Sequence, residues 1–129
     1  MPHLSIRVDF EPTGSALGPG MVQLLERVAE LGSIRRAAAS MDMSYRKAWL
    51  LIQEIQKTFD GPVVTAEVGG VAGGGTHLTE LGSELLKLYR RVESRATAAA
   101  KPDLDILSAM VRANAAPRRA GRRNKSAKS

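Results

Sequence analysis

The chain has 129 residues, enough for one domain with short appendages, and 43% of them are hydrophobic. It contains no cysteine, which excludes disulfides, iron–sulfur clusters, thiolate zinc sites and cysteine nucleophiles. No apolar run approaches the roughly 18 residues of a membrane span, and the N-terminus lacks the basic start and apolar run of a signal peptide. We therefore expect a cytoplasmic protein that does not bind membranes.

The net charge of +6 is unevenly distributed along the chain. Six of the 19 cations follow residue 116, where there is no acid, and the remaining 13 equal the 13 acids in number. A basic tail of this composition is predicted to be disordered and to add only non-specific affinity for phosphates. Specific binding to nucleic acid would have to come from cationic clusters within residues 1–116.

Hydrophobic periodicity predicts a strand and then a helix at the start of the chain. Residues 4–10 alternate between apolar and polar side chains, as in a half-buried strand, and a loop rich in Pro and Gly follows. Apolar residues recur at helical spacing over residues 21–31, and Gly32 is placed to end that helix.

Two further helices are predicted in close succession. Ser33 is the expected N-cap of a short helix over 34–41, and Ser44 is the expected N-cap of a longer one that reaches about Phe59. Adjacent alanines in the short helix would let a neighbouring helix cross closely. A tight turn joins the two, which is the pattern of a helix-turn-helix.

A hairpin and a last helix complete the pattern. Residues 63–68 are predicted to form a strand, GGVAGGG a turn, and THL the returning strand, before Thr79 caps a long helix. The fold expected is mainly α with a small β wing: a winged helix-turn-helix. We divide the chain into a DNA-binding domain with a dimerisation helix, residues 1–100, and a short helical extension with a disordered basic tail, residues 101–129.

Four cations in the helix pair are candidate DNA contacts. The recognition helix of this fold enters the major groove with its N-terminal residues first. At that head, Arg46 is suited to guanine, Tyr45 to a sugar or a thymine methyl, and Ser44 and Lys47 to phosphate.

The side chains around this head are also candidates. Arg35 and Arg36, on the preceding helix, would reach the DNA backbone. Trp49 lies one turn beyond Tyr45, and either faces the groove edge or packs in the core, the more common role for tryptophan. The competing interpretation of the cations is that they are solvated faces of ordinary helices.

Five glycines within seven positions mark the predicted wing tip: Gly69, Gly70, Gly73, Gly74 and Gly75. A phosphate-cradling nucleotide loop would require GK[ST] at a helix start, and here a strand-like segment without lysine follows. Glycines in a wing let backbone N–H groups approach DNA phosphates, and Gly73 and Gly74 are the candidates. His77 either touches the DNA backbone or is simply an exposed residue of a hairpin.

Residues 19–93 resemble the N-terminal DNA-binding domain of the ModE family, molybdate-responsive bacterial transcription regulators with a LysR-type winged helix. The resemblance rests on GSIRRAAASMDMSYRKAWLLIQEIQ, GGVAGGGTHLTELG and LLKLYRRVE. It implies sequence-specific binding of double-stranded DNA by a homodimer, with the SYRKAW segment as the recognition helix and the glycines as the wing. Full-length members carry C-terminal molybdate-binding barrels, and residues 94–129 do not fit such a barrel. Molybdate sensing is therefore not expected on this chain, and neither is any other cofactor.

The apolar positions of the last helix point independently to a dimer. Two stripes are predicted, because more apolar residues are present than one domain needs to bury. The candidate dimerisation residues are Leu81, Leu85, Leu88 and Val92 on one side, with Tyr89 beside Leu86 on another. Alternatively, the first helix and the N-terminal strand cover both stripes.

Enzymatic function has little support in the sequence. There is no clustered Ser/His/Asp set, no framed pair of carboxylates and no spacing of metal ligands. With only His3 and His77 in the chain, a histidine metal site is not expected. The alternative to a specific regulator is a winged-helix module for protein interaction, with only non-specific, tail-driven DNA affinity.

Overall fold

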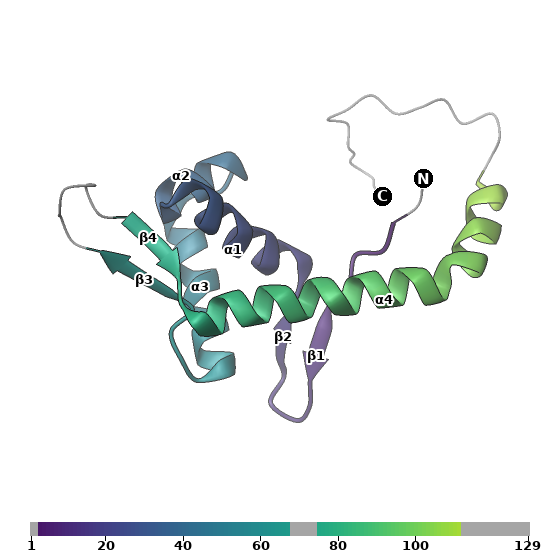
Figure 1. Ribbon diagram of the computed structural model, residues 1–129, viewed down its shortest axis with the longest axis horizontal. Coiled ribbons are helices and arrows are strands. Elements are labelled where there is room, and N and C mark those ends of the chain that lie inside the picture. The colour runs from purple at the N-terminus through teal and green to yellow at the C-terminus, as the bar shows by residue number, and fades with distance from the viewer. Residues whose placement is uncertain (1–2, 68–74, 112–129) are drawn as a thin grey trace.

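The computed structural model describes residues 3–67 and 75–111 of the chain. Within that part, the fold is a winged helix-turn-helix made of helices and two antiparallel hairpins (Figure 1). The elements follow in this order: β1 (Val8–Phe10), β2 (Ser15–Leu17), α1 (Pro19–Leu31), α2 (Ile34–Ser40), α3 (Tyr45–Phe59), β3 (Val64–Glu67), β4 (Gly75–Leu78) and α4 (Glu80–Met110).

The N-terminal segment differs from the strand and loop predicted from the sequence. Only Val8–Phe10 is a strand, and it pairs with β2, which lies in the segment expected to be a loop. A tight turn makes this possible: the Gly14 N–H donates to the Phe10 carbonyl at 3.0 Å, and Gly14 has a φ of 81°, which suits glycine. Leu17 at the end of β2 is buried, so the short hairpin supplies a side chain to the core.

The core lies where α1, α2 and α3 meet. Side chains of these three helices are buried there, together with Val63 from the base of the wing: Val22, Leu24, Leu25, Val28, Ala37, Ala38, Ala48, Ile52 and Ile55. Five other residues expected to face inward are only partly buried: Met21, Leu31, Ile34, Met41 and Leu51. The two buried alanines of α2 remove the bulk that would hold helices apart. The helix pair therefore packs tightly, and the outward face of α3 is fixed by the burial of its inward face.

The predicted helix boundaries are confirmed by their capping contacts. Ser33 Oγ accepts from the Arg36 N–H at 3.0 Å, and Ser44 Oγ accepts from the Lys47 N–H at 3.0 Å. Gly32 ends α1 in the left-handed conformation, with φ 69°. The serine contacts satisfy donors that the first turn of a helix leaves unpaired.

The wing is attached to α4 through Thr79. Its hydroxyl donates to the Pro62 carbonyl at 2.6 Å and accepts from the Gly82 N–H at 3.1 Å, while its own N–H donates to the Val63 carbonyl. Gly82 is required there, because a Cβ at this position would lie 2.3 Å from the Val63 oxygen. The start of α4 is therefore held against Pro62 and Val63, the residues that lead into β3. Strand β3 pairs with β4 from Val64↔Leu78 to Glu67↔Gly75.

Helix α4 is a single helix of 31 residues that includes Pro102. The helical segment predicted after Lys101-Pro102 is thus the continuation of the same helix. The helix runs along the body and its last part turns away from the line of the rest (Figure 1). Proline lacks the N–H that would bond to the preceding turn, which accounts for a bend in this region.

Candidate nucleic-acid interface

The head of α3 presents large side chains on the outer surface of the molecule. Tyr45 is 41% exposed and Trp49 is 43% exposed, and Leu50 is exposed beside them. Ala48, Ile52 and Ile55 occupy the inward face of the same helix. The interpretation of Trp49 as a core residue is therefore wrong: it lies about 100° around the helix from Ala48 and so outside the buried stripe.

Arg35 reaches across from α2 to this surface. Its guanidinium carbon lies 4.5 Å from the centroid of the Tyr45 ring, so the cation stacks on the first residue of α3. Such a contact is attractive because the face of an aromatic ring carries negative charge density. It brings a cation of the first helix of the pair to the head of the second.

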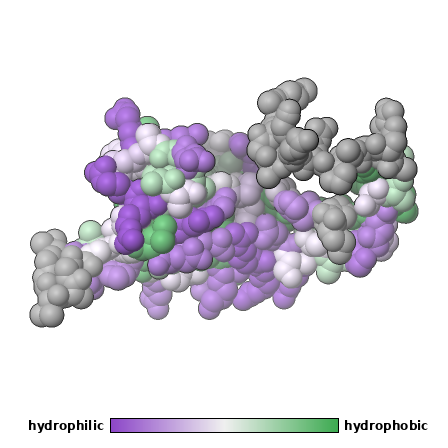
Figure 2. Space-filling view, turned by 90° about the horizontal axis from the view of Figure 1, so that it is seen from above, coloured by the Kyte–Doolittle hydropathy of each residue, from purple (hydrophilic) through white to green (hydrophobic). Residues whose placement is uncertain are grey.

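The other cations of the head are exposed. Arg46 and Lys47 follow Tyr45 in the first turn, and Arg36 lies next to Arg35 on α2. Figure 2 shows strongly hydrophilic residues gathered over the end of the body that carries α2. All four cations are thus accessible to a polyanion.

Two residues at this surface, Arg7 and Leu50, were not singled out in the sequence. Arg7 and Lys47 line the same open hollow of about 350 Å³, next to the start of α1 at Pro19. Leu50 is an exposed apolar residue one turn beyond Arg46. Arg7 and Lys47 are far apart in the sequence, so their proximity could not be predicted from it. The outward position of Leu50 could have been predicted, because it is four residues after Arg46 and so lies on the same face of the helix.

The wing projects from the same end of the molecule as α2 and α3, opposite the far end of α4 (Figure 1). The Thr76 N–H donates to the Gly32 carbonyl at 2.9 Å, which ties β4 to the end of α1. His77 is exposed, and its Nε2 lies 3.5 Å from a carboxylate oxygen of Glu67 on β3. The candidate wing-tip residues Gly73 and Gly74 lie outside the described residues.

The predicted dimerisation residues divide into two groups. Leu85 and Tyr89 are buried in the core of their own chain, and Leu81 packs partly against it. The prediction that Leu85 and Tyr89 face a partner needs correction, because α1 and the N-terminal segment already cover that side of α4. Leu88 and Val92 are exposed, so they are the members of the set that a partner can still contact.

The exposed pair borders an apolar groove of about 230 Å³. The groove lies between α4, the β1–β2 hairpin and the end of α3, and its lining is Val8, Phe10, Leu17, Phe59, Leu85, Leu88, Tyr89 and Val92. Phe10 and Phe59 meet there edge to face, with ring centroids 5.6 Å apart. The groove and the exposed pair together form a continuous apolar surface on one side of α4.

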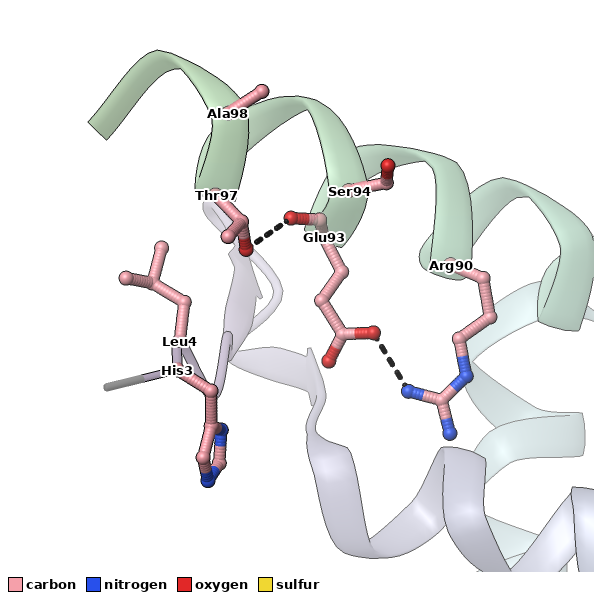
Figure 3. A pocket seen from close by; sticks show the side chains of 7 residues that line it. All are labelled: His3, Leu4, Arg90, Glu93, Ser94, Thr97 and Ala98. Atoms are coloured by element: carbon pink, nitrogen blue, oxygen red, sulfur yellow. Dashed lines mark hydrogen bonds and ion pairs between the residues drawn. The ribbon is translucent and has the colours of Figure 1, made fainter. Parts of the chain in front are cut away.

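A second hollow, of about 460 Å³, lies where the N-terminal segment passes α4 (Figure 3). Arg90 donates to Glu26 of α1 through Nε at 2.8 Å and to Glu93 at 2.8 Å, so two carboxylates balance its charge. Hydrogen bonding to Glu26 raises the pKa of Arg90 further above its ordinary value. Arg90 is therefore a tie between α1 and α4 rather than a free cation for an anionic ligand.

Metal-binding clusters and membrane-spanning helices are both absent from the part of the chain that the structure describes. Among residues 3–67 and 75–111, no group of three or more His, Asp or Glu side chains is placed to hold a metal ion. In the same ranges, no helix combines the length and the apolar character needed to cross a membrane.

Known proteins similar to this chain are named as transcriptional regulators, molybdenum transport proteins and molybdenum-pterin-binding proteins. The molybdenum-pterin-binding protein MopB of Rhodobacter capsulatus is 40% identical over 87 residues, which are 67% of this chain and 32% of that protein. The molybdenum transport protein ModE of Azotobacter vinelandii is 39% identical over 80 residues, 62% of this chain and 30% of its own. The DNA-binding transcriptional dual regulator ModE of Escherichia coli K12 is 37% identical over 71 residues, 55% of this chain and 27% of its own.

These matches cover only part of each relative. The chain spans about a third of the length of the relatives it matches. No protein-family model matches the chain. Over more than half of its length, the chain is therefore similar to one part of ModE-type regulators.

Proposed function

We propose that the protein is a sequence-specific DNA-binding transcription regulator of the ModE type, which acts in the cytoplasm as a homodimer. The observation that carries this proposal is the outward head of α3: a capped helix whose first turn presents Tyr45, Arg46 and Lys47, with Arg35 stacked on the tyrosine. A helix fits the major groove of DNA, and such side chains can read base edges and bind phosphate.

In this proposal the residues have different roles. Arg46 forms paired hydrogen bonds to a guanine edge, and Trp49 and Leu50 supply apolar contact to the groove wall or a thymine methyl. Arg35, Arg36 and Lys47 bind phosphate oxygens and so fix the register of the helix. The wing, with Gly73, Gly74 and His77, contacts the adjacent backbone.

The similarity to ModE-named regulators supports the same assignment, since one of them is named as a DNA-binding regulator. Those relatives are named as regulators or binding proteins rather than enzymes, and we propose that this chain is not an enzyme either. We do not extend molybdate or molybdenum-pterin binding to residues 1–129. That property belongs, in our proposal, to parts of the relatives that this chain does not match.

One observation favours a second candidate function. Tyr45, Trp49 and Leu50 form an exposed apolar cluster, and clusters of aromatic residues also occur at protein–protein interfaces. In that case the protein would be a winged-helix interaction module whose DNA affinity comes from its basic tail alone.

A competition gel shift separates the two functions. The full chain is first used to select duplexes from a random pool, with and without molybdate, and the selected duplex is then labelled and challenged with unlabelled random duplex. A specific regulator should keep the labelled complex at an excess of random competitor of about a hundredfold or more. An interaction module should select no sequence, and its complex should disappear at equal competitor and with rising salt.

A further inference from the structure

A hollow of about 350 Å³ opens beside the head of α3, and two cations from distant parts of the chain line it. Lys47 comes from the first turn of α3, and Arg7 comes from the segment that leads into β1. Both side chains are exposed, and the other residues of the lining are uncharged. No carboxylate of the lining therefore balances the two positive charges, and the hollow suits an anionic partner.

Arg7 forms an ion pair with Asp9 that leaves most of its donors available. The Arg7 Nε donates to the Asp9 carboxylate at 2.9 Å, whereas the two Nη groups of an arginine carry further N–H donors. The side chains of the pair are 67% and 55% exposed, and ion pairs in such an environment are weak and screened by salt. Arg7 can therefore keep this contact and still donate its Nη groups to a phosphate.

The space beside the two cations is open. Ala16, Gly18 and Gly20 are among the residues that line the hollow, so little side-chain bulk is present there. A Cβ placed on either glycine would meet no other described part of the chain within 4 Å. A bulky partner such as a sugar-phosphate backbone can therefore approach Arg7 and Lys47 closely.

Lys47 and Tyr45 lie on opposite flanks of the head of α3. Successive residues of an α-helix are about 100° apart around its axis, so Tyr45 and Lys47 lie on either side of Arg46. Arg35 from α2 stacks on the ring of Tyr45, and Arg7 shares the hollow with Lys47. Each flank of the helix head therefore has a cation from another part of the chain beside it.

The major groove of DNA has a phosphate backbone on each side, and its width of roughly 12 Å is close to the diameter of an α-helix. A helix that reads bases from its middle face therefore has one backbone at each flank. We propose that Arg7 and Lys47 bind phosphates of one DNA strand at this hollow, while Arg35 binds the backbone of the other strand across the groove. The N-terminal segment then contacts DNA in addition to the helix-turn-helix and the wing.

This inference rests on the proposed DNA binding and adds a residue to its interface. Phosphate contacts fix the orientation of a protein on the duplex and carry no direct sequence information. Contacts on both flanks of α3 would hold Arg46 in one register over the base edges. Loss of Arg7 should therefore lower the affinity for all duplexes without changing the selected sequence.

Uncharged phosphate analogues test the contact directly. Duplexes of the selected sequence are made with a single methylphosphonate at each backbone position in turn, and their binding to the full chain is measured by fluorescence anisotropy. The natural chain should lose about threefold to tenfold in affinity when the phosphate that Arg7 contacts is neutral. Arg7→Gln should bind the unmodified duplex more weakly by a similar factor, and it should be insensitive to the methylphosphonate at that position.

Lys57→Gln is the matched control for loss of charge. Lys57 is exposed on the same helix as Lys47, about 15 Å further from its head. The variant should bind within about twofold of the natural chain and stay sensitive at every phosphate to which the natural chain responds. Arg35→Gln should lose its sensitivity at a phosphate of the opposite strand from that of Arg7.

Two results would overturn the inference. One is that Arg7→Gln responds to every methylphosphonate as the natural chain does, and the other is that Arg7 and Arg35 depend on phosphates of the same strand. In both cases a selected sequence that changes with Arg46→Ala would leave the proposed DNA binding intact. If no sequence is selected from the random pool, the proposed DNA binding fails and this contact fails with it.

Discussion

Arg35 and Tyr45 connect the two helices of the helix-turn-helix through a stacked cation and ring, 4.5 Å apart. In the proposed complex this contact orients a phosphate-binding guanidinium beside the head of α3. Replacing the ring by an aliphatic side chain removes the stacking, so Tyr45→Leu should weaken binding of the selected duplex about twofold to fivefold. Fluorescence anisotropy at fixed salt measures the change.

Tyr45→Phe is the control for this prediction. It keeps the aromatic face and removes only the hydroxyl, so its affinity should stay within about twofold of the natural chain. Equal losses in Tyr45→Leu and Tyr45→Phe would show that the hydroxyl, rather than the stacking, is what DNA binding requires.

Gly82 packs against the backbone of Val63, at the base of the wing. Because a Cβ there would lie 2.3 Å from the Val63 oxygen, Gly82→Ala should force the backbone apart and lower the free energy of unfolding by about 1–3 kcal/mol. Urea titration followed by circular dichroism measures this. Gly20→Ala, in a helical position with open space around it, should instead be neutral or stabilise by up to about 1 kcal/mol.

We expect the folded protein to lose stability at alkaline pH because of Tyr89. Burial raises the pKa of its phenol, Glu93 adds to the effect, and the hydroxyl donates to the Ile6 carbonyl. Because the folded state holds this proton more tightly than the unfolded state, the stabilisation is complete below about pH 10 and declines as the pH rises through the higher folded pKa.

The variant Tyr89→Phe separates this titration from other alkaline effects. It should be less stable than the natural chain at pH 7 by about 1 kcal/mol, because the hydrogen bond to Ile6 is absent. The difference should shrink above about pH 10, as measured by urea unfolding at several pH values. A constant difference up to about pH 11 would contradict the assignment of the titration to Tyr89.

The basic tail should contribute affinity without specificity. Its six cations follow residue 116, so a chain truncated after that residue should bind all duplexes more weakly and to a similar extent. The slope of log affinity against log salt should become shallower by about one for each DNA phosphate that the tail neutralises in the full chain. If truncation changed the selected sequence, the assignment of specificity to the recognition helix alone would be wrong.

The helix-turn-helix could be predicted because its signals are local. Ser33, Ser44 and Thr79 cap the helices that follow them, and Gly32 ends the first one, as the sequence indicates. Each of these contacts joins residues only a few positions apart. Residue type and spacing are therefore sufficient to predict where these helices begin and end.

Other features of the fold depend on contacts between residues far apart in the sequence, and the spacing of residue types does not predict these. Strand β2 has three residues, too few for an alternating pattern, and it forms only because a turn at Gly14 brings it back to β1. Leu85 and Leu88 have the same residue type on the same helix, yet only the first is buried, since the body covers one side of α4. The proximity of Arg7 and Lys47 likewise arises from the N-terminal hairpin, which carries Arg7 to a helix far along the sequence.

The most direct test of the account is selection of duplexes from a random pool by the natural chain and by Arg46→Ala. The natural chain should enrich a site with two related half-sites about one helical turn, roughly 34 Å, apart. Arg46→Ala should bind that site more weakly by about 1–3 kcal/mol and show no preference at one base pair per half-site. Identical selected sequences and affinities for the two proteins would contradict the assignment of α3 as the recognition helix.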